Sequence, residues 1–156
     1  MEPTLRSAVL LWTIIAAGIN SGSFFVFSNF VMGSLSRLTP AEGARAMQEI
    51  NRAAPNPGFM ATLMGGAIAG IMLAATAPGV PGAWWQAAGG ALSVATALIT
   101  IAFHVPRNNA LGRVDADTAE GQAVWIRYIV SWTRGNHLRA ATSSLSVACL
   151  VLAAAA

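Results

Sequence analysis

The sequence has no lysine, only one cysteine and few charged residues of either sign. Arginine supplies every basic side chain, and charged residues make up 10% of the 156-residue chain. A typical soluble domain carries about 25% charged residues. Hydrophobic residues account for 55% of this chain. This balance excludes an ordinary soluble domain and predicts an integral membrane protein.

The single cysteine, Cys149, lies in an apolar run close to the last residue of the sequence. One cysteine excludes an intramolecular disulfide, a CxxC redox pair and a cysteine-ligated zinc site or cluster. The net charge is +3, and the arginines are spread among predicted helix ends instead of forming one basic patch. A nucleic-acid partner is therefore not expected.

Four apolar segments reach about the 20 residues that a membrane-spanning helix needs. They cover residues 5–35, 58–77, 83–104 and 137–156. Turns and polar stretches separate them, and no internal repeat is present. We therefore predict an all-α fold: an integral membrane four-helix bundle that forms a single domain over residues 1–156.

Two further helices are predicted outside the spans. Thr39–Glu42 combines a capping Thr, a Pro at the first helical position and a Glu placed for a capping box. The amphipathic helix that follows ends near Ala53 and is too short and too charged to span a membrane. In loop three, Pro106 is expected to end the third span. Asp117–Glu120 then begins a helical extension that leads into the fourth span.

Glycine pairs predict close approaches between helices in the first three spans. The pairs are Gly18 and Gly22, Gly66 and Gly70, and Gly89 and Gly90. Asn20 lies well inside the first span, where an amide needs a hydrogen-bond partner. We expect that partner on another helix.

The stretch Trp125–Arg139 carries the densest set of functional side chains in the sequence. At about 100° per residue, one helical face gathers five of them within an arc of about 80°. They are Trp125, Tyr128, Trp132, Asn136 and Arg139. Arg127 and Arg134 lie on the opposite side, and His137 lies between the two faces. Such a helix suits either an interfacial segment with aromatic anchors or one wall of a pocket for a flat organic molecule.

A second concentration of polar groups follows the third span. His104, Arg107, Asn108 and Asn109 lie within six residues of one another, and Asn51 lies in loop one on the same predicted membrane side. We expect these amides to tie loop three to loop one through hydrogen bonds from side chain to backbone.

Four pieces, spread over nearly the whole chain, occur together in a known pattern. They are Phe27–Met32, Ile50–Arg52 followed by Asn56–Pro57, Val105–Asn109 and Trp132–Arg139. With these pieces the sequence resembles the anthrone oxygenase family of small membrane proteins. One departure is Gly33, where the family's Met is followed by Pro. That difference affects the end of the first helix and no obvious chemical group.

The resemblance implies a four-helix membrane fold and, by analogy with fungal relatives, oxidation of an anthrone to an anthraquinone by molecular oxygen. Those relatives act without an evident cofactor, so we expect oxygen as co-substrate and no resident metal. The expected partners are a small aromatic substrate and membrane lipids. Many bacterial members have no assigned activity, and the expected location is a bacterial inner membrane.

Oxidation of an anthrone-like substrate requires a base, a fixed positive charge and flat apolar walls. The candidate catalytic residues are His137, His104, Arg139 and Arg107. The candidate substrate-binding residues are Asn51, Asn108, Asn109, Trp125, Tyr128, Trp132 and Asn136. Structural alternatives exist for each: a histidine at a helix end can be an interfacial hydrogen bonder, and the arginines can pair with nearby carboxylates.

Two other functions fit the same residues. The first is a metal or haem site formed by His104 and His137, which is a thin ligand set. The second is a non-enzymatic membrane protein, either a partner subunit or a lipid-binding module. A transporter is disfavoured because the spans contain no acidic residue and no repeat.

The distribution of arginine predicts the orientation in the membrane. Loops one and three, with the extension into the fourth span, hold eight of the nine arginines. Cytoplasmic loops are enriched in basic residues. We therefore expect loops one and three in the cytoplasm and both termini outside.

This orientation can be tested with cysteines introduced at Arg45 and Arg113. In intact cells, both should be protected from a thiol reagent that cannot cross the membrane. Ready labelling of both positions would overturn the orientation while leaving the four-span fold unaffected.

Overall fold

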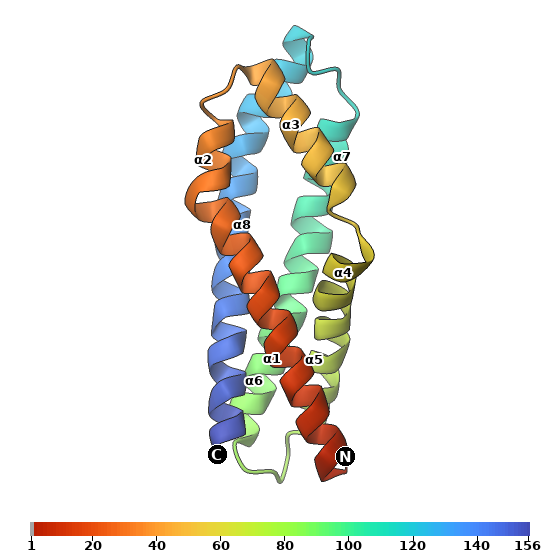
Figure 1. The fold of residues 1–156 in the computed structure, drawn as a ribbon, viewed down its shortest axis with the longest axis vertical. Coiled ribbons are helices and arrows are strands. Elements are labelled where there is room, and N and C mark those ends of the chain that lie inside the picture. Colours follow the sequence, from red (N-terminus) through yellow and green to blue (C-terminus); the bar gives the residue numbers. More distant parts are fainter. Residues whose placement is uncertain (1) are drawn as a thin grey trace.

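Four long helices lie side by side in the structure, a computed structural model that describes residues 2–156 (Figure 1). Within this range, the helices long and apolar enough to cross a membrane cover Pro3–Leu35, Pro57–Ala75, Ala83–Gly112 and Ala119–Ala155. No strand occurs among the described residues. The all-α membrane bundle predicted from the sequence is therefore confirmed.

Three of the four long helices contain a short π-helical segment. The first long helix comprises α1 (Pro3–Val26), η1 (Phe27–Val31) and α2 (Met32–Leu35). The second comprises α4 (Pro57–Met60), η2 (Ala61–Gly65) and α5 (Gly66–Ala75). The third comprises α6 (Ala83–Ile99), η3 (Thr100–His104) and α7 (Val105–Gly112). The fourth, α8 (Ala119–Ala155), is α-helical throughout.

The amphipathic helix of loop one, α3 (Pro40–Ala53), lies across the end of the bundle away from the termini (Figure 1). Its capping box is present: Thr39 Oγ1 accepts from the Glu42 amide at 3.4 Å, and Glu42 Oε2 accepts from the Thr39 amide at 3.0 Å. Hydrogen bonds from the Thr39 side chain and backbone hold the pKa of Glu42 below its usual value. Ala44 and Met47 are buried against the bundle.

Pro106 does not end the third long helix, so the prediction from the sequence is wrong at this point. The chain passes from η3 into α7 without a break and continues to Gly112. A proline inside a helix removes one amide donor and crowds the carbonyl one turn earlier. Here Pro106 falls within the first two positions of α7, directly after the wider π-helical turn, where that carbonyl has more room.

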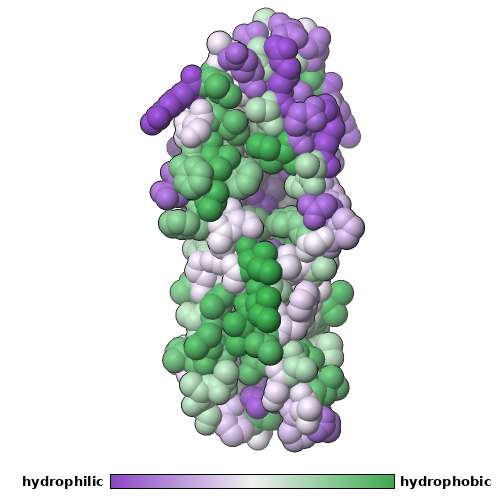
Figure 2. All heavy atoms as spheres, viewed as in Figure 1, coloured by the Kyte–Doolittle hydropathy of each residue, from purple (hydrophilic) through white to green (hydrophobic). Residues whose placement is uncertain are grey.

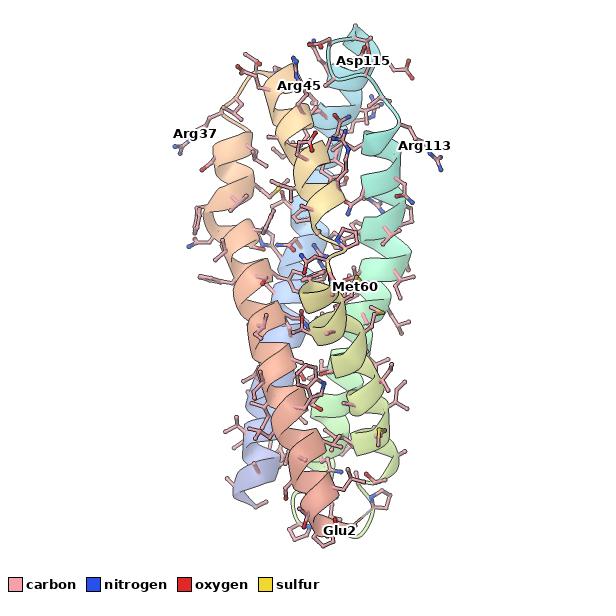
Figure 3. All side chains as sticks on the ribbon, turned by 45° about the vertical axis from the view of Figure 1, so that its right-hand side comes forward. Glu2, Arg37, Arg45, Met60, Arg113 and Asp115 are labelled. Atoms are coloured by element: carbon pink, nitrogen blue, oxygen red, sulfur yellow. The ribbon has the colours of Figure 1, made fainter. Side chains whose placement is uncertain are left out.

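Charged groups mark both ends of the bundle. Figure 3 shows Arg37, Arg45, Arg113 and Asp115 at one end and Glu2 at the other. On the face drawn in Figure 2, hydrophilic residues gather over α3, while mainly hydrophobic and intermediate residues cover the rest. The fold thus places loops one and three together at one polar end.

Asn20 and most of the glycine pairs behave as predicted. Asn20 Nδ2 donates to the Thr62 carbonyl at 3.2 Å, which links α1 to η2. A Cβ at Gly70 would lie 2.7 Å from the Gly90 carbonyl oxygen, so α5 and α6 touch through their backbones. Gly18 and Gly22 differ, because an added Cβ there would meet nothing within 4 Å. That pair brings no helix of this chain close.

These glycines give a matched test of packing. Gly70→Ala should lower the free energy of unfolding by about 1–3 kcal/mol because the new methyl group must push α5 away from α6. Gly22→Ala should leave stability unchanged or slightly higher, since alanine favours the helix and meets no neighbour. Thermal unfolding in detergent measures both. Equal losses for the two variants would contradict the packing described here.

Candidate functional site

A buried polar cluster lies where α8 meets η1 and η3. Its members are Phe24 of α1, Thr100 and His104 of η3, and Trp132, Asn136 and Arg139 of α8. None of these side chains is exposed by more than 9%. The predicted face of α8 is confirmed, because Trp125 and Tyr128 are also buried, whereas Arg127 and Arg134 are exposed.

The π-helical segments position this cluster. A π-helical turn is wider than an α-helical turn, and such turns are frequent at functional sites. Next to η1, Asn136 Nδ2 donates to the Phe24 carbonyl at 2.7 Å and to Ser28 Oγ at 2.8 Å. The distorted turns of the first helix are therefore tied directly to α8. In η3, the same widening places Thr100 and His104 together in the buried interior.

Arg139 lies at the centre of the cluster and is only 5% exposed. Its Nη2 donates to Asn136 Oδ1 at 2.8 Å, and its Nη1 lies 3.4 Å from Thr100 Oγ1. The guanidinium carbon lies 4.2 Å from the centre of the Phe24 ring and 5.0 Å from that of Trp132. Its Nε has no hydrogen-bond partner among residues 2–156.

No carboxylate balances this buried charge among residues 2–156. The ion pairs in this range join Arg45 to Asp117 and Arg52 to Glu49, both on the exposed surface. An isolated charge is costly to bury unless a counter-charge or several hydrogen bonds compensate it. Arg139 has neutral partners and one unused donor, so this arrangement favours binding of an anion.

His104 is fully buried and stands edge-on to Trp132, with the ring centres 5.2 Å apart and the planes at 90°. Its Nδ1 lies 3.4 Å from the Ile99 carbonyl. A carbonyl can only accept a hydrogen bond, so Nδ1 is the protonated nitrogen of the neutral ring. Nε2 has no hydrogen-bond partner among the described residues.

An aromatic ladder extends from this cluster toward α3. Trp125 and Tyr128 are stacked at 5.8 Å, and Tyr128 and Trp132 at 6.2 Å. A Cβ at Gly43 would lie 2.8 Å from the Trp125 ring, so α3 closes the far end of the ladder. The three predicted aromatic residues are thus brought together, but Trp125 lies two rings away from His104.

Asn108 of α7 holds two rings of the aromatic ladder in place through hydrogen bonds. Its Oδ1 accepts hydrogen bonds from Tyr128 Oη at 2.8 Å and from Trp132 Nε1 at 3.0 Å. Asn51 Nδ2 donates to the same Tyr128 oxygen at 3.3 Å. These amides therefore connect loop one to loop three through the side chain of Tyr128. The sequence had predicted bonds from the amide side chains to the backbone.

Gln48 of α3 makes hydrogen bonds from its side chain to the backbone of loop three. Its amide donates to the Leu111 carbonyl at 2.9 Å and to the Val114 carbonyl at 3.0 Å. Beside it, a polar groove of about 440 Å³ separates α3 from α7. Asn51, Asn108 and Asn109 line this groove. Asn109 is exposed and makes no hydrogen bond to the described residues.

Two predicted catalytic residues lie apart from the cluster. Arg107 stacks on the Phe103 ring at 3.4 Å and donates to the Phe103 carbonyl at 2.8 Å, so it is engaged by its own helix. His137 is exposed. It lies about 200° around α8 from Gly135, the residue that faces His104. The two histidines therefore do not converge on one site.

No group of three or more His, Cys, Asp or Glu side chains suited to a metal ion occurs in residues 2–156. The polar cluster instead combines arginine, amide, hydroxyl and imidazole groups with aromatic rings. The metal or haem alternative relied on His104 and His137, which the structure places apart: His104 is buried, whereas His137 is exposed.

Several residues in or beside the cluster were missed from the sequence. Phe24 and Ser28 share a face of the first helix with Asn20, and this periodic pattern could have indicated them. Thr100 gave no such signal, because threonines inside apolar helices often bond only to their own backbone, as Thr13 and Thr76 do here.

A comparison with known protein families shows the family to which this chain belongs. A family model described as anthrone oxygenase matches residues 54–149. The chain belongs to the anthrone oxygenase family. The matched residues include η3, α7 and those residues of the buried cluster that lie on α8. Comparisons with curated proteins and with solved structures found no match.

Asn108 and Asn109 allow a paired test of the site's framework. Asn108→Ala should lower the free energy of unfolding by about 1–3 kcal/mol, because it leaves the Tyr128 and Trp132 donors without their shared acceptor. Asn109→Ala should change stability by less than about 0.5 kcal/mol, because the side chain is exposed. Chemical unfolding followed by tryptophan fluorescence measures both. A neutral Asn108→Ala would show that this acceptor is dispensable.

Proposed function

We propose that this member of the anthrone oxygenase family oxidises a flat phenolic or anthrone-like substrate with molecular oxygen at the Arg139 cluster. The observation that carries the proposal is the buried guanidinium without a carboxylate, placed between two aromatic rings. A planar organic anion complements both features, since its charge suits Arg139 and its faces suit Phe24 and Trp132. Family membership supports an oxygenase-like function in general.

Arg139 would stabilise the anion formed from the substrate. Its Nη2 is held by Asn136, which in turn is anchored to the first helix, so the guanidinium plane is fixed before the substrate arrives. The free Nε supplies a directed donor for an oxygen atom of the substrate. Preorganised donors in a site shielded from water stabilise developing charge far more than the same groups do in solution.

His104 would act as the base. Its Nε2 is unpartnered and lies in the same aromatic enclosure as Arg139. Asn136 was expected to bind substrate directly, but its amide is already engaged by Phe24, Ser28 and Arg139. We assign it instead to positioning Arg139. Of the two histidines, we assign the role of base to His104 alone, because the side chain of His137 is exposed.

The reaction can be balanced with these groups. His104 removes one proton from the acidic methylene carbon and leaves a delocalised anion beside Arg139. The anion transfers an electron to oxygen, and the resulting pair combines to form a carbon–oxygen bond, which gives a hydroperoxide after protonation. Loss of the second hydrogen on that carbon, with cleavage of the O–O bond, releases water and leaves the ketone. One anthrone and one oxygen molecule thus give one anthraquinone and one water.

The proposed reaction needs no resident cofactor, because the substrate anion itself supplies the electrons to oxygen. The protein contributes proton removal, charge stabilisation and orientation. An internal cavity of about 10 Å³ lies one helical turn away, where Asn20, Thr96 and Ser143 are among its lining residues. It holds about one water-sized molecule, so an aromatic substrate must reach the cluster by another route.

The histidines give the sharpest test of this assignment. His104→Gln should lower oxygen uptake by about 10²–10⁴-fold, the usual contribution of a general base. His137→Gln should retain nearly full activity, because that side chain lies on the outer surface. Purified protein in detergent would be assayed against a panel of anthrones and hydroquinones by oxygen electrode and mass spectrometry. Equal activity of the two variants, or no turnover of any compound by the native chain, would refute the proposal.

Arg139→Lys tests the anion site separately. Lysine keeps the charge but loses the planar donor array. Loss of one charge-assisted hydrogen bond costs about 1.5–3 kcal/mol, so kcat/KM should fall about 10- to 100-fold. Arg127→Lys is the matched control, since Arg127 is exposed on the other side of the same helix. Unchanged kinetics in folded Arg139→Lys would exclude a directed role for the guanidinium.

A further inference from the structure

An apolar groove of about 540 Å³ runs along the outer surface between the third long helix and α8. Ile99, Ala102 and Phe103 line one side, and Gly135 and Leu138 line the other. Arg134, at the edge, is the only charged residue in the lining. The volume falls within the range of about 300–1,000 Å³ that is typical of sites for small organic ligands.

The groove is separated from the buried cluster by a single layer of side chains. Phe103 lines the groove and contacts His104 with its ring, the centres lying 5.2 Å apart. Ile99 also lines the groove and supplies the carbonyl that faces His104 Nδ1. A Cβ at Gly135 would collide with the Phe103 ring and lie 3.1 Å from His104 Cε1. The absence of a side chain at Gly135 thus brings the groove next to His104.

The groove lies where the apolar part of the bundle ends. α8 has 37 residues, which at 1.5 Å per residue is about 55 Å, far longer than the hydrocarbon core of about 30 Å. Residues 140–155 of α8 carry no charge, and Arg134 and Arg139 directly precede them. The bilayer therefore covers the half of α8 that ends in the chain's last residues, and its boundary passes near Arg134. The groove opens sideways at this boundary.

We infer that this groove is the lateral entrance through which a membrane-dissolved, flat phenolic substrate reaches His104 and Arg139. This inference rests on the function proposed above and adds the route. The apolar lining accommodates the rings, and Arg134 attracts the phenolic oxygens at the headgroup level. Arg134 has no carboxylate within ion-pair distance among the described residues. Phe103 must turn aside for the substrate to pass, so it forms the gate.

Arg107 gains a role in this arrangement. The guanidinium of Arg107 packs against the ring of Phe103, which lines the groove. A hydrogen bond from Arg107 to the Phe103 carbonyl holds the two side chains together. Arg107 therefore keeps the gate closed and does not contact the buried cluster. This assignment differs from the catalytic role expected from the sequence.

Photo-labelling locates the entrance without requiring turnover. The chain in lipid nanodiscs would be irradiated with an azido-substituted hydroxyanthraquinone, and the modified peptides would be mapped by mass spectrometry. Labels should concentrate on Ala102 and Leu138, and an excess of unmodified hydroxyanthraquinone should remove them. Labels spread evenly over the lipid-facing surface, no labelling at all, or labels confined to the polar groove between α3 and α7 would each overturn the inference.

A pair of tryptophan variants tests whether the groove serves the reaction. Leu138→Trp fills the groove, so it should abolish labelling there and raise KM about tenfold, or 1.4 kcal/mol, with kcat within about twofold. Leu145→Trp is the control, because Leu145 lies two turns along the same stripe with 55% exposure against 53% for Leu138. Size-exclusion profiles would confirm that both variants fold. Equal kinetics for both variants would indicate a groove occupied by bulk lipid only.

The outcomes also separate this inference from the proposed function. Labelling of the groove in a chain that consumes no oxygen would support the docking site and refute the reaction. Oxygen uptake with labels only in the polar groove beside Asn109 would support the reaction and refute the lateral entrance.

Discussion

The burial of one positive charge is the constraint on which the rest of the structure depends. Arg139 sits among apolar helices, where a guanidinium is tolerated only if polar groups and aromatic faces surround it. Asn136 meets this need by accepting from Arg139 while donating to the first helix. Thr100 approaches from the third helix. Residues of η1 and η3 and one end of the aromatic stack therefore lie around that single group.

Much of this arrangement was predictable because it follows local rules. The Thr39 cap and the buried face of α8 follow from side-chain hydrogen bonding and a period of 3.6 residues, and the structure contains both. The π-helical turns were not predictable, because they depend on partners in other helices such as Asn136. Pro106 was therefore misjudged as a helix end. The choice between His104 and His137 also required the fold, because both lie near the predicted end of a span.

Hydrogen bonds of Asn108 and Asn51 link the polar end of the bundle to the buried cluster. Asn108 holds Trp132 and Tyr128 at once, and Tyr128 in turn accepts from Asn51 of α3. A displacement of α3 would therefore change the position of Trp132, which borders both Arg139 and His104. The cap helix is thus mechanically part of the cluster, although none of its residues enters it.

The buried arginine also bears on how the protein reaches its membrane. An arginine inside the hydrocarbon core adds to the cost of inserting an isolated helix, by up to about 2.5–3.5 kcal/mol at the bilayer centre. The first three long helices carry no such charge in their apolar parts, whereas α8 carries Arg139 together with Asn136, Ser143 and Ser146. Among the four long helices, α8 is therefore the least able to enter the bilayer alone. Its insertion depends on the other three being in place, with their polar groups ready to receive it.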